Sequence, residues 1–232
     1  MTSSKPKVLF ILTSHGSLDP TTKETGWYLP EMAHPFAELV NTADIVVASP
    51  KGGKAPLDSQ SNDKSDEVSQ KFLNENIGIT ETTEKLSSFI GKADEFAAIF
   101  YVGGHGPMYD LAHNETSHSL IKEFAEKGKI DSAVCHGPAA LAYAKLSSGE
   151  YLIKDSEVTG FSNTEEHTLG TTQYMPFSLE DVLATNSGGN FSKAKADWGS
   201  HVKTARGGKL ITGQNPASAA DVGKAILKAI SA

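Results

Sequence analysis

Residues 130–138, IDSAVCHGP, decide the fold of this chain. Ile130 to Val134 form a short run that is typical of a strand in a parallel sheet. Pro138 follows at a position that suits the first turn of a helix, where its missing N–H costs nothing. Cys135 therefore stands at a bend between a strand and a helix. This order predicts a nucleophile elbow, the turn that raises a reactive side chain above the end of a sheet strand.

The alternation of strand and helix patterns continues on both sides of this bend, which predicts a mostly parallel sheet covered on both faces. No repeat, long linker or break in composition divides the chain, so we expect a single domain over residues 1–232. Further strands are expected at 7–14, 43–49 and 96–102, and a hairpin at 202–205 and 209–212. Helices are expected from Pro35, over 66–76, 80–90, 114–127 and 138–146, starting within 175–181, and after the Asn215-Pro216 cap.

The composition narrows the class of protein. A hydrophobic fraction of 38% and a charged fraction of 21% are typical of a globular protein with a full core. The net charge of -7 argues against a nucleic-acid surface, and no apolar run approaches the ~20 residues of a membrane span. The start of the chain lacks the features of a secretory signal, and its single cysteine suits a reducing compartment. These features predict a cytoplasmic protein, without distinguishing the cytoplasm from the nucleus.

The predicted elbow gives Cys135 a chemical role. Backbone N–H groups at the start of a helix stabilise a thiolate, and the adjacent His136 can transfer a proton. A lone cysteine is more often a buried structural residue, but the strand–turn–helix context favours a nucleophile.

A second glycine-rich turn, Gly103-Gly104-His105-Gly106, follows another expected strand. Its backbone N–H groups, with that of Gly137, are candidates to hold a developing oxyanion and bind substrate. His105 either contributes to this site or only hydrogen-bonds the loop. The turn matches neither a dinucleotide-binding fingerprint nor a Walker A loop. No H-x-x-x-H or H-E-x-x-H spacing occurs, so we expect no metal.

Several blocks in this order resemble those of the ThiJ/PfpI superfamily, whose members are similar to class I glutamine amidotransferases. Within it, the chain is most similar to the heat-shock chaperone and glyoxalase III branch. The resemblance implies a flavodoxin-like three-layer sandwich with a mostly parallel central sheet and a small added hairpin. The blocks are 31–36 (EMAHPF), 104–106 (GHG), 133–138 (AVCHGP), 159–161 (TGF) and 212–218 (TGQNPAS).

The resemblance also implies roles for particular residues. Glu31 matches a carboxyl that contacts the thiol, and it should be protonated or share a proton with it. The family triad maps to Cys135, His136 and Glu166, with Glu165 as the alternative acid. The competing interpretations are that Glu31 only begins a helix and that Glu165 and Glu166 are both solvated.

The activity implied by the resemblance is a glutathione-independent glyoxalase that converts methylglyoxal, a small aldehyde, to lactate without a cofactor. A homodimer and a holdase role toward unfolded client proteins are implied as well. The alternatives are a holdase without turnover and a redox sensor. Amide hydrolysis ranks lower, because the late His-x-Glu pair of the amidotransferases is missing at His201-Val202-Lys203. Residues 171–191 resemble the family least and are expected to shape substrate choice.

Overall fold

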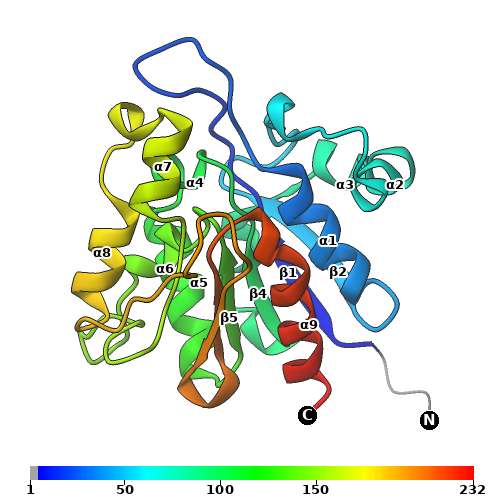
Figure 1. Cartoon of the computed structure of the whole chain (residues 1–232). Coiled ribbons are helices and arrows are strands. Elements are labelled where there is room, and N and C mark those ends of the chain that lie inside the picture. The colour runs from blue at the N-terminus through cyan, green and yellow to red at the C-terminus, as the bar shows by residue number, and fades with distance from the viewer. Residues whose placement is uncertain (1–4) are drawn as a thin grey trace.

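A computed structural model describes residues 5–232 as one seven-stranded sheet with helices on both sides (Figure 1). The strand order is β3-β2-β1-β4-β5-β7-β6, and every pair is parallel except β6 with β7. This architecture confirms the predicted α/β class, and β6 and β7 form the expected hairpin. The strands are β1 (Lys7–Ile11), β2 (Asp44–Ser49), β3 (Glu84–Lys85), β4 (Ala98–Tyr101), β5 (Ile130–Val134), β6 (Val202–Ala205) and β7 (Leu210–Gly213).

The central strands are apolar because both faces of the sheet are covered. In β1, Leu9 pairs with Val46 of β2 on one side and with Ile99 of β4 on the other. Leu9 and Ile99 have no exposed surface. Continuous burial of this kind produces the unbroken apolar runs from which these strands were predicted.

Two groups of helices cover the sheet (Figure 1). α1 and α9 pack side by side on one face, while α5, α6 and α8 gather on the other. Within the described range, no helix combines the length and the hydropathy needed to traverse a bilayer. The helices are α1 (Leu29–Leu39), α2 (Glu67–Glu75), α3 (Gly78–Glu81), α4 (Pro107–Asp110), α5 (Glu115–Glu126), α6 (Ala139–Ala142), α7 (Asn163–Leu169), α8 (Leu179–Asn186) and α9 (Ala219–Ile230).

The first helix differs from its prediction. It begins at Leu29, so Pro30 is the proline of its first turn and Pro35 lies inside the helix. A proline in a helix interior removes one backbone hydrogen bond and is normally a breaker. Here the segment is retained as a helix by packing, because α9 approaches closely at Gly223, whose α-hydrogens face Pro35.

Two other predicted helices are wrong in extent. Over residues 80–90, α3 ends at Glu81, and the chain then adds the short strand β3 to the edge of β2. Pairing with that open edge outweighs the local helical pattern. The helix expected over 138–146 is only the single turn α6, after which Lys145 forms an isolated bridge with Tyr151.

Candidate active site

The bend after β5 holds Cys135 in a left-handed conformation, with φ of 60°. Its N–H donates to the carbonyl of Gly213 at 3.0 Å, and its carbonyl accepts from the N–H of Phe161 at 2.9 Å. A non-glycine residue with positive φ persists only where its surroundings fix it, and such residues gather at functional sites. This geometry is that of a nucleophile elbow.

The side chains of Cys135, His136 and Glu166 form a line of polar contacts, which we call the triad line. The Sγ atom of Cys135 lies 3.3 Å from Nδ1 of His136, and Nε2 of the same ring lies 2.6 Å from Oε2 of Glu166. His136 is 1% exposed and Glu166 is 8% exposed. The order thiol, imidazole and carboxylate is the arrangement in which a carboxylate orients a general base toward a nucleophile.

Glu166 is fixed by two further contacts. Its Oε1 atom lies 3.0 Å from Nε2 of His105 and also accepts a hydrogen bond from the hydroxyl of Thr171. His105 therefore reaches across to the triad carboxylate as well as belonging to its own glycine-rich loop. Thr171 has no marker in the sequence beyond its place after Gly170, the left-handed residue that ends α7.

The charges of this line follow from burial and pairing. Burial opposes a charge on Glu166, but the His136 and His105 imidazoles outweigh it and hold the pKa of the carboxyl well below its usual range. Burial lowers the pKa of His136, and the nearby Glu166 offsets only part of that effect. At neutral pH the line consists of an ionised carboxylate and a neutral imidazole, which can accept the thiol proton.

Glu31, in the first turn of α1, stands on the other side of the thiol. The residue is fully buried, and neither carboxyl oxygen has a hydrogen-bond partner of good geometry within residues 5–232. Burial raises the pKa of Glu31 to about 8, although the Cys135 thiol and the amides of Gly103 and Gly104 offset part of that rise. Glu31 is therefore a neutral acid at pH 7 with a proton to donate.

The surroundings of the Cys135 thiol do not favour its ionised form in the absence of a substrate. Burial, followed by the charge of Glu31, raises the pKa of Cys135 well above its ordinary value. The helix after the bend, α6, is a single turn, so it supplies little of the positive field that the sequence suggested. This shift favours a protonated thiol, beside an imidazole that is placed to accept its proton.

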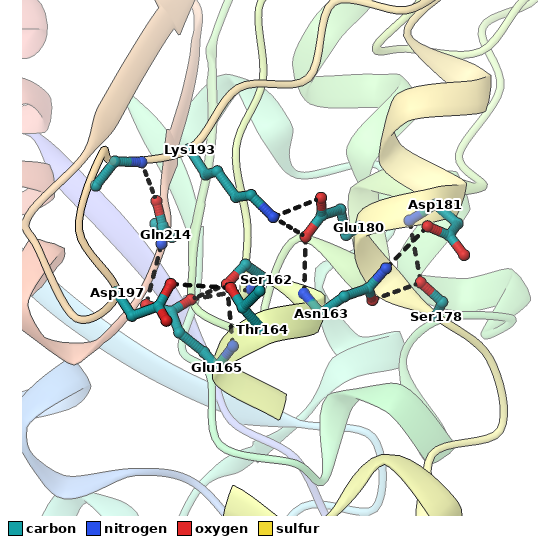
Figure 2. A network of polar contacts seen from close by, with 11 residues as sticks. Ser162, Asn163, Thr164, Glu165, Ser178, Glu180, Asp181, Lys193, Asp197 and Gln214 are labelled. Carbon is teal, nitrogen blue, oxygen red and sulfur yellow. Dashed lines mark hydrogen bonds and ion pairs between the residues drawn. The ribbon is translucent and has the colours of Figure 1, made fainter. Parts of the chain in front are cut away.

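Glu165 points away from this line and has a structural role. Its carboxylate accepts from the backbone and hydroxyl of Ser162 and from Gln214 at 3.0 Å (Figure 2). It also accepts from Asn215 at 2.8 Å. Ser162 and Glu165 form a capping box at the start of α7. The structure thus brings Glu166, and not Glu165, to His136.

The two glycines predicted to bind an oxyanion differ. Gly104 has φ of 87°, and a side chain there would collide with the carbonyl of Gly26, so its backbone lies against the cavity as only glycine allows. Gly137 does not fit its predicted role, because its N–H already donates to the carbonyl of Val134 at 2.8 Å. Gly137 instead lets the bend pass beneath the carbonyl of Tyr101.

A cavity of about 290 Å³ opens beside the thiol. Cys135 is only 3% exposed, yet it lines this cavity together with Glu31, His136, Gly104 and His105. The segment that follows β2 also contributes a wall, through the buried Asp58. Lys23, Asp58, Gln60 and Leu169, to which the sequence assigned no role, line it too. Thr171 and Tyr174 also line it, and they belong to the segment 171–191 that is expected to shape substrate choice.

The residues that could hold a metal are part of the same line. One nitrogen each of His105 and His136 and one oxygen of Glu166 lie within 4.8 Å of one another. Two imidazoles and a carboxylate are a donor set that zinc accepts. Sequence spacing does not reveal this set, because its members are 30 or more residues apart in the chain. The expectation of no metal stays a prediction.

Comparisons with known proteins identify relatives over almost the whole chain. Glyoxalase 3 of Candida albicans is 28% identical over 239 residues, which cover 96% of this chain and 98% of that protein. The crystal structure of the Candida protein superimposes with a TM-score of 0.84 over 97% of each chain. The Rapid Encystment Protein 24 kDa of Francisella tularensis is 37% identical, with a TM-score of 0.91 over 97% of this chain and 99% of that one.

A partial match points the same way. The probable glutathione-independent glyoxalase hsp3104 of Schizosaccharomyces pombe is 33% identical over 59% of this chain and 62% of its own length. The model of the DJ-1/PfpI family matches residues 30–229, a span that contains the elbow, the triad line and Glu31. The chain belongs to the DJ-1/PfpI family.

Proposed function

We propose that this protein is a glutathione-independent glyoxalase that converts methylglyoxal and water to lactate through a hemithioacetal on Cys135. The observation that carries the proposal is the pair of opposed groups around one thiol. On one side, neutral His136 can take the thiol proton, and on the other, Glu31 holds a proton beside the cavity. Relatives named as glutathione-independent glyoxalases support the proposed activity.

The first step forms the carbon–sulfur bond. The Cys135 proton passes to Nδ1 of His136, and the ionised Glu166 stabilises the imidazolium that results. The sulfur adds to the aldehyde carbon, and the π electrons of that carbonyl move to its oxygen. The Gly104 backbone lies beside the thiol, where it supports this oxyanion until Glu31 protonates it.

The second stage moves hydrogen from one carbon to the next. After giving up its proton, Glu31 is a buried carboxylate whose burial, only partly offset by the amides of Gly103 and Gly104, makes it a stronger base than an ordinary glutamate. It removes the proton from the sulfur-bearing carbon to form an enediol and returns it to the neighbouring carbon, while the hydroxyl proton of the sulfur-bearing carbon passes to the neighbouring oxygen, which leaves a thioester of lactate. Water then cleaves the thioester: its oxygen bonds to the acyl carbon, the departing sulfur takes the proton held by His136, and one proton of the water returns to Glu31. Lactic acid departs and ionises to lactate. The sum is methylglyoxal plus water giving lactate, with no external oxidant or reductant.

The direct test is lactate formation from methylglyoxal without added glutathione. Wild-type protein should produce lactate, and Cys135→Ala should produce none because no hemithioacetal can form. Glu31→Gln should still consume the thiol-reactive aldehyde in a single slow binding step but release no lactate. A wild-type protein that makes no lactate contradicts the proposal.

The redox alternative has less support. Oxidation of cysteine follows thiolate character and exposure, and Cys135 is buried with a raised pKa. A holdase role does not depend on the thiol, so it is compatible with the proposed enzyme.

A further inference from the structure

Two exposed apolar side chains flank the mouth of the cavity. Leu169 is 50% exposed and Trp198 is 41% exposed, and both line the same cavity as Cys135. In the described part of the chain, the other large exposed hydrophobic residues, Val40 and Ile90, do not line it. Isolated apolar residues on a surface need no explanation, but two of them at one active-site mouth indicate contact with a ligand.

Trp198 is held in place against its own backbone preference. Its φ is 65°, a left-handed conformation that bulky residues rarely adopt. Its N–H donates to Oε1 of Glu165 at 3.0 Å, and the carbonyl of the next residue, Gly199, accepts from Asn215 at 2.9 Å. The backbone on both sides of the strained residue is therefore anchored by buried side chains.

The segment before Trp198 is tied down in the same way (Figure 2). The hydroxyl of Thr164 donates to Asp197 at 2.9 Å, and Lys193 pairs with Glu180 at 2.9 Å. These contacts attach residues 193–197 to the starts of α7 and α8. Side-chain bonds thus fix a segment that belongs to no helix or strand.

The anchored indole extends an aromatic surface toward the reacting atoms. Its ring meets Phe161 edge to face, with centroids 5.7 Å apart, and Phe161 lies 4.4 Å from the ring of His136. An apolar wall therefore runs from the triad imidazole to the mouth. The cavity of about 290 Å³ is much larger than methylglyoxal, which leaves this wall uncovered when the aldehyde carbon is at the thiol.

We propose that Trp198 and Leu169 form a subsite for an apolar, ring-sized substituent on the ketone carbon of a 2-oxoaldehyde, and that Glu165 is the positioning residue that holds Trp198 there. This inference rests on the proposed function for its reaction. It goes further by assigning the substrate class: 2-oxoaldehydes with an aryl or branched alkyl group, in preference to methylglyoxal.

The chain's single cysteine allows a test that needs no turnover. Bromoacetone and 2-bromoacetophenone alkylate thiols by the same displacement, in which a sulfur–carbon bond forms and bromide leaves with the electron pair of the broken bond. They differ only in a methyl or phenyl group on the ketone. Intact mass measures the rate at which each reagent labels Cys135, and that rate is divided by the reagent's rate with N-acetylcysteine. The quotient for 2-bromoacetophenone over the quotient for bromoacetone is the phenyl-to-methyl preference. We expect about tenfold in wild type, since a buried aromatic contact contributes about that factor.

Variants show whether the preference arises from the subsite or only from the accessibility of the Cys135 thiol. Trp198→Ala and Leu169→Ala should each lose most of the preference, and Glu165→Gln should lose part of it with increased acrylamide quenching of Trp198. Trp27 is fully buried, so quenching reports Trp198. Ile90→Ala, which truncates an equally exposed residue away from the cavity, should keep the wild-type preference. The proposal is overturned if wild type shows no phenyl-to-methyl preference, or if both Trp198→Ala and Leu169→Ala keep the wild-type preference.

Turnover distinguishes this inference from the proposed function. Wild type should show a higher kcat/KM for phenylglyoxal than for methylglyoxal, and Trp198→Ala should reduce that ratio about tenfold. If neither aldehyde is turned over while the labelling preference holds, the glyoxalase assignment fails and the subsite stands. If both aldehydes are turned over and Trp198→Ala leaves the ratio of their kcat/KM values unchanged, the subsite fails and the glyoxalase assignment stands.

Discussion

Glu31 and Cys135 share a buried space in which two negative charges are too costly. Burial raises the pKa of both groups, and the charge of an ionised Glu31 would raise that of the Cys135 thiol further, whereas a hydrogen bond from the thiol lowers that of Glu31. These shifts favour one proton on the acid and one on the thiol in the free protein. In the proposed reaction, His136 takes the thiol proton and the developing oxyanion takes the proton of Glu31.

The raised pKa of Glu31 predicts a pH dependence of stability. Between pH 4.5 and about 8, the folded chain keeps the Glu31 proton while the unfolded chain has lost it. The unfolded state then binds fewer protons, so the free energy of unfolding falls as pH rises through this window. The change in the free energy of unfolding from pH 5 to pH 8 is compared between wild type and Glu31→Gln. We expect that change to be more negative in wild type by an amount on the order of 3 kcal/mol.

Urea denaturation at the two pH values measures this difference. Glu38→Gln is the matched control, because Glu38 is a partly exposed glutamate on the same helix. It should follow the wild-type dependence. Parallel pH dependence in wild type and Glu31→Gln would show that the carboxyl is ionised in the folded state.

The carboxylate behind His136 predicts a loss of rate. Glu166→Gln keeps the shape of the side chain but removes the charge that stabilises the imidazolium, so kcat for methylglyoxal should fall by about 10²-fold or more. Glu157→Gln alters a carboxylate that is mostly exposed and should leave kcat unchanged. Equal kcat in Glu166→Gln and wild type would exclude a triad role.

At the scale of elements, α1 and α9 depend on a close approach. A methyl group on Gly223 would lie 2.8 Å from Cα of Pro35 and 3.1 Å from Cβ of Glu38. Gly223→Ala gains helix propensity but forces the helices apart, and we expect a net destabilisation of about 1–2 kcal/mol. Because Glu31 lies on the same helix, the activity of the variant should also decrease.

Thermal or urea unfolding tests this prediction. Gly78→Ala serves as the control, since a methyl group there meets no atom within 4 Å and the backbone has no positive φ. It should be neutral or slightly stabilising. A Gly223→Ala variant as stable as wild type would show that the two helices can separate at little cost.

Patterns of burial explain which elements could be predicted from the sequence. Strands such as β1 and β4 are buried on both faces and therefore appear as apolar runs. The start of α1, the edge strand β3 and the single turn α6 depend on neighbours that are distant in sequence, so local patterns misplace them. The elbow was predictable because strand, bend and helix start are contiguous in 130–138.

The site was predictable to a similar degree. Cys135 and His136 follow from the elbow, whereas Glu31 and Glu166 required a family resemblance. One local signal was available for the adjacent glutamates, because Ser162-x-x-Glu165 is a capping-box pattern and assigns Glu165 to the start of α7. Lys23, Thr171 and Tyr174 come from loops whose positions depend on the whole fold.

At the scale of the whole molecule, the site forms at one edge of the sheet. The glycine turn follows β4 and the thiol follows β5, so both stand at the carboxyl ends of parallel strands. α1 brings Glu31 to that edge and α7 brings Glu166 (Figure 1). Ligands of open α/β sheets bind at this edge because the strand ends and the following loops meet there.

A holdase activity would be a property of the outer surface and not of this edge. We expect Cys135→Ser to suppress aggregation of a heat-unfolded client protein as well as wild type does, because the buried thiol offers no surface to a client. Light scattering at equal protein concentrations measures this. A Cys135→Ser variant that is folded but fails to suppress aggregation would tie the two activities together.

The chain contains one sulfhydryl, and it lies at the reactive bend. The fraction of sulfhydryls that a reagent modifies therefore equals the fraction of active sites that it modifies. In a partly modified sample, the remaining activity should decline in proportion to the labelled fraction. Curvature in a plot of activity against labelled fraction would show that copies of the chain in an oligomer influence each other.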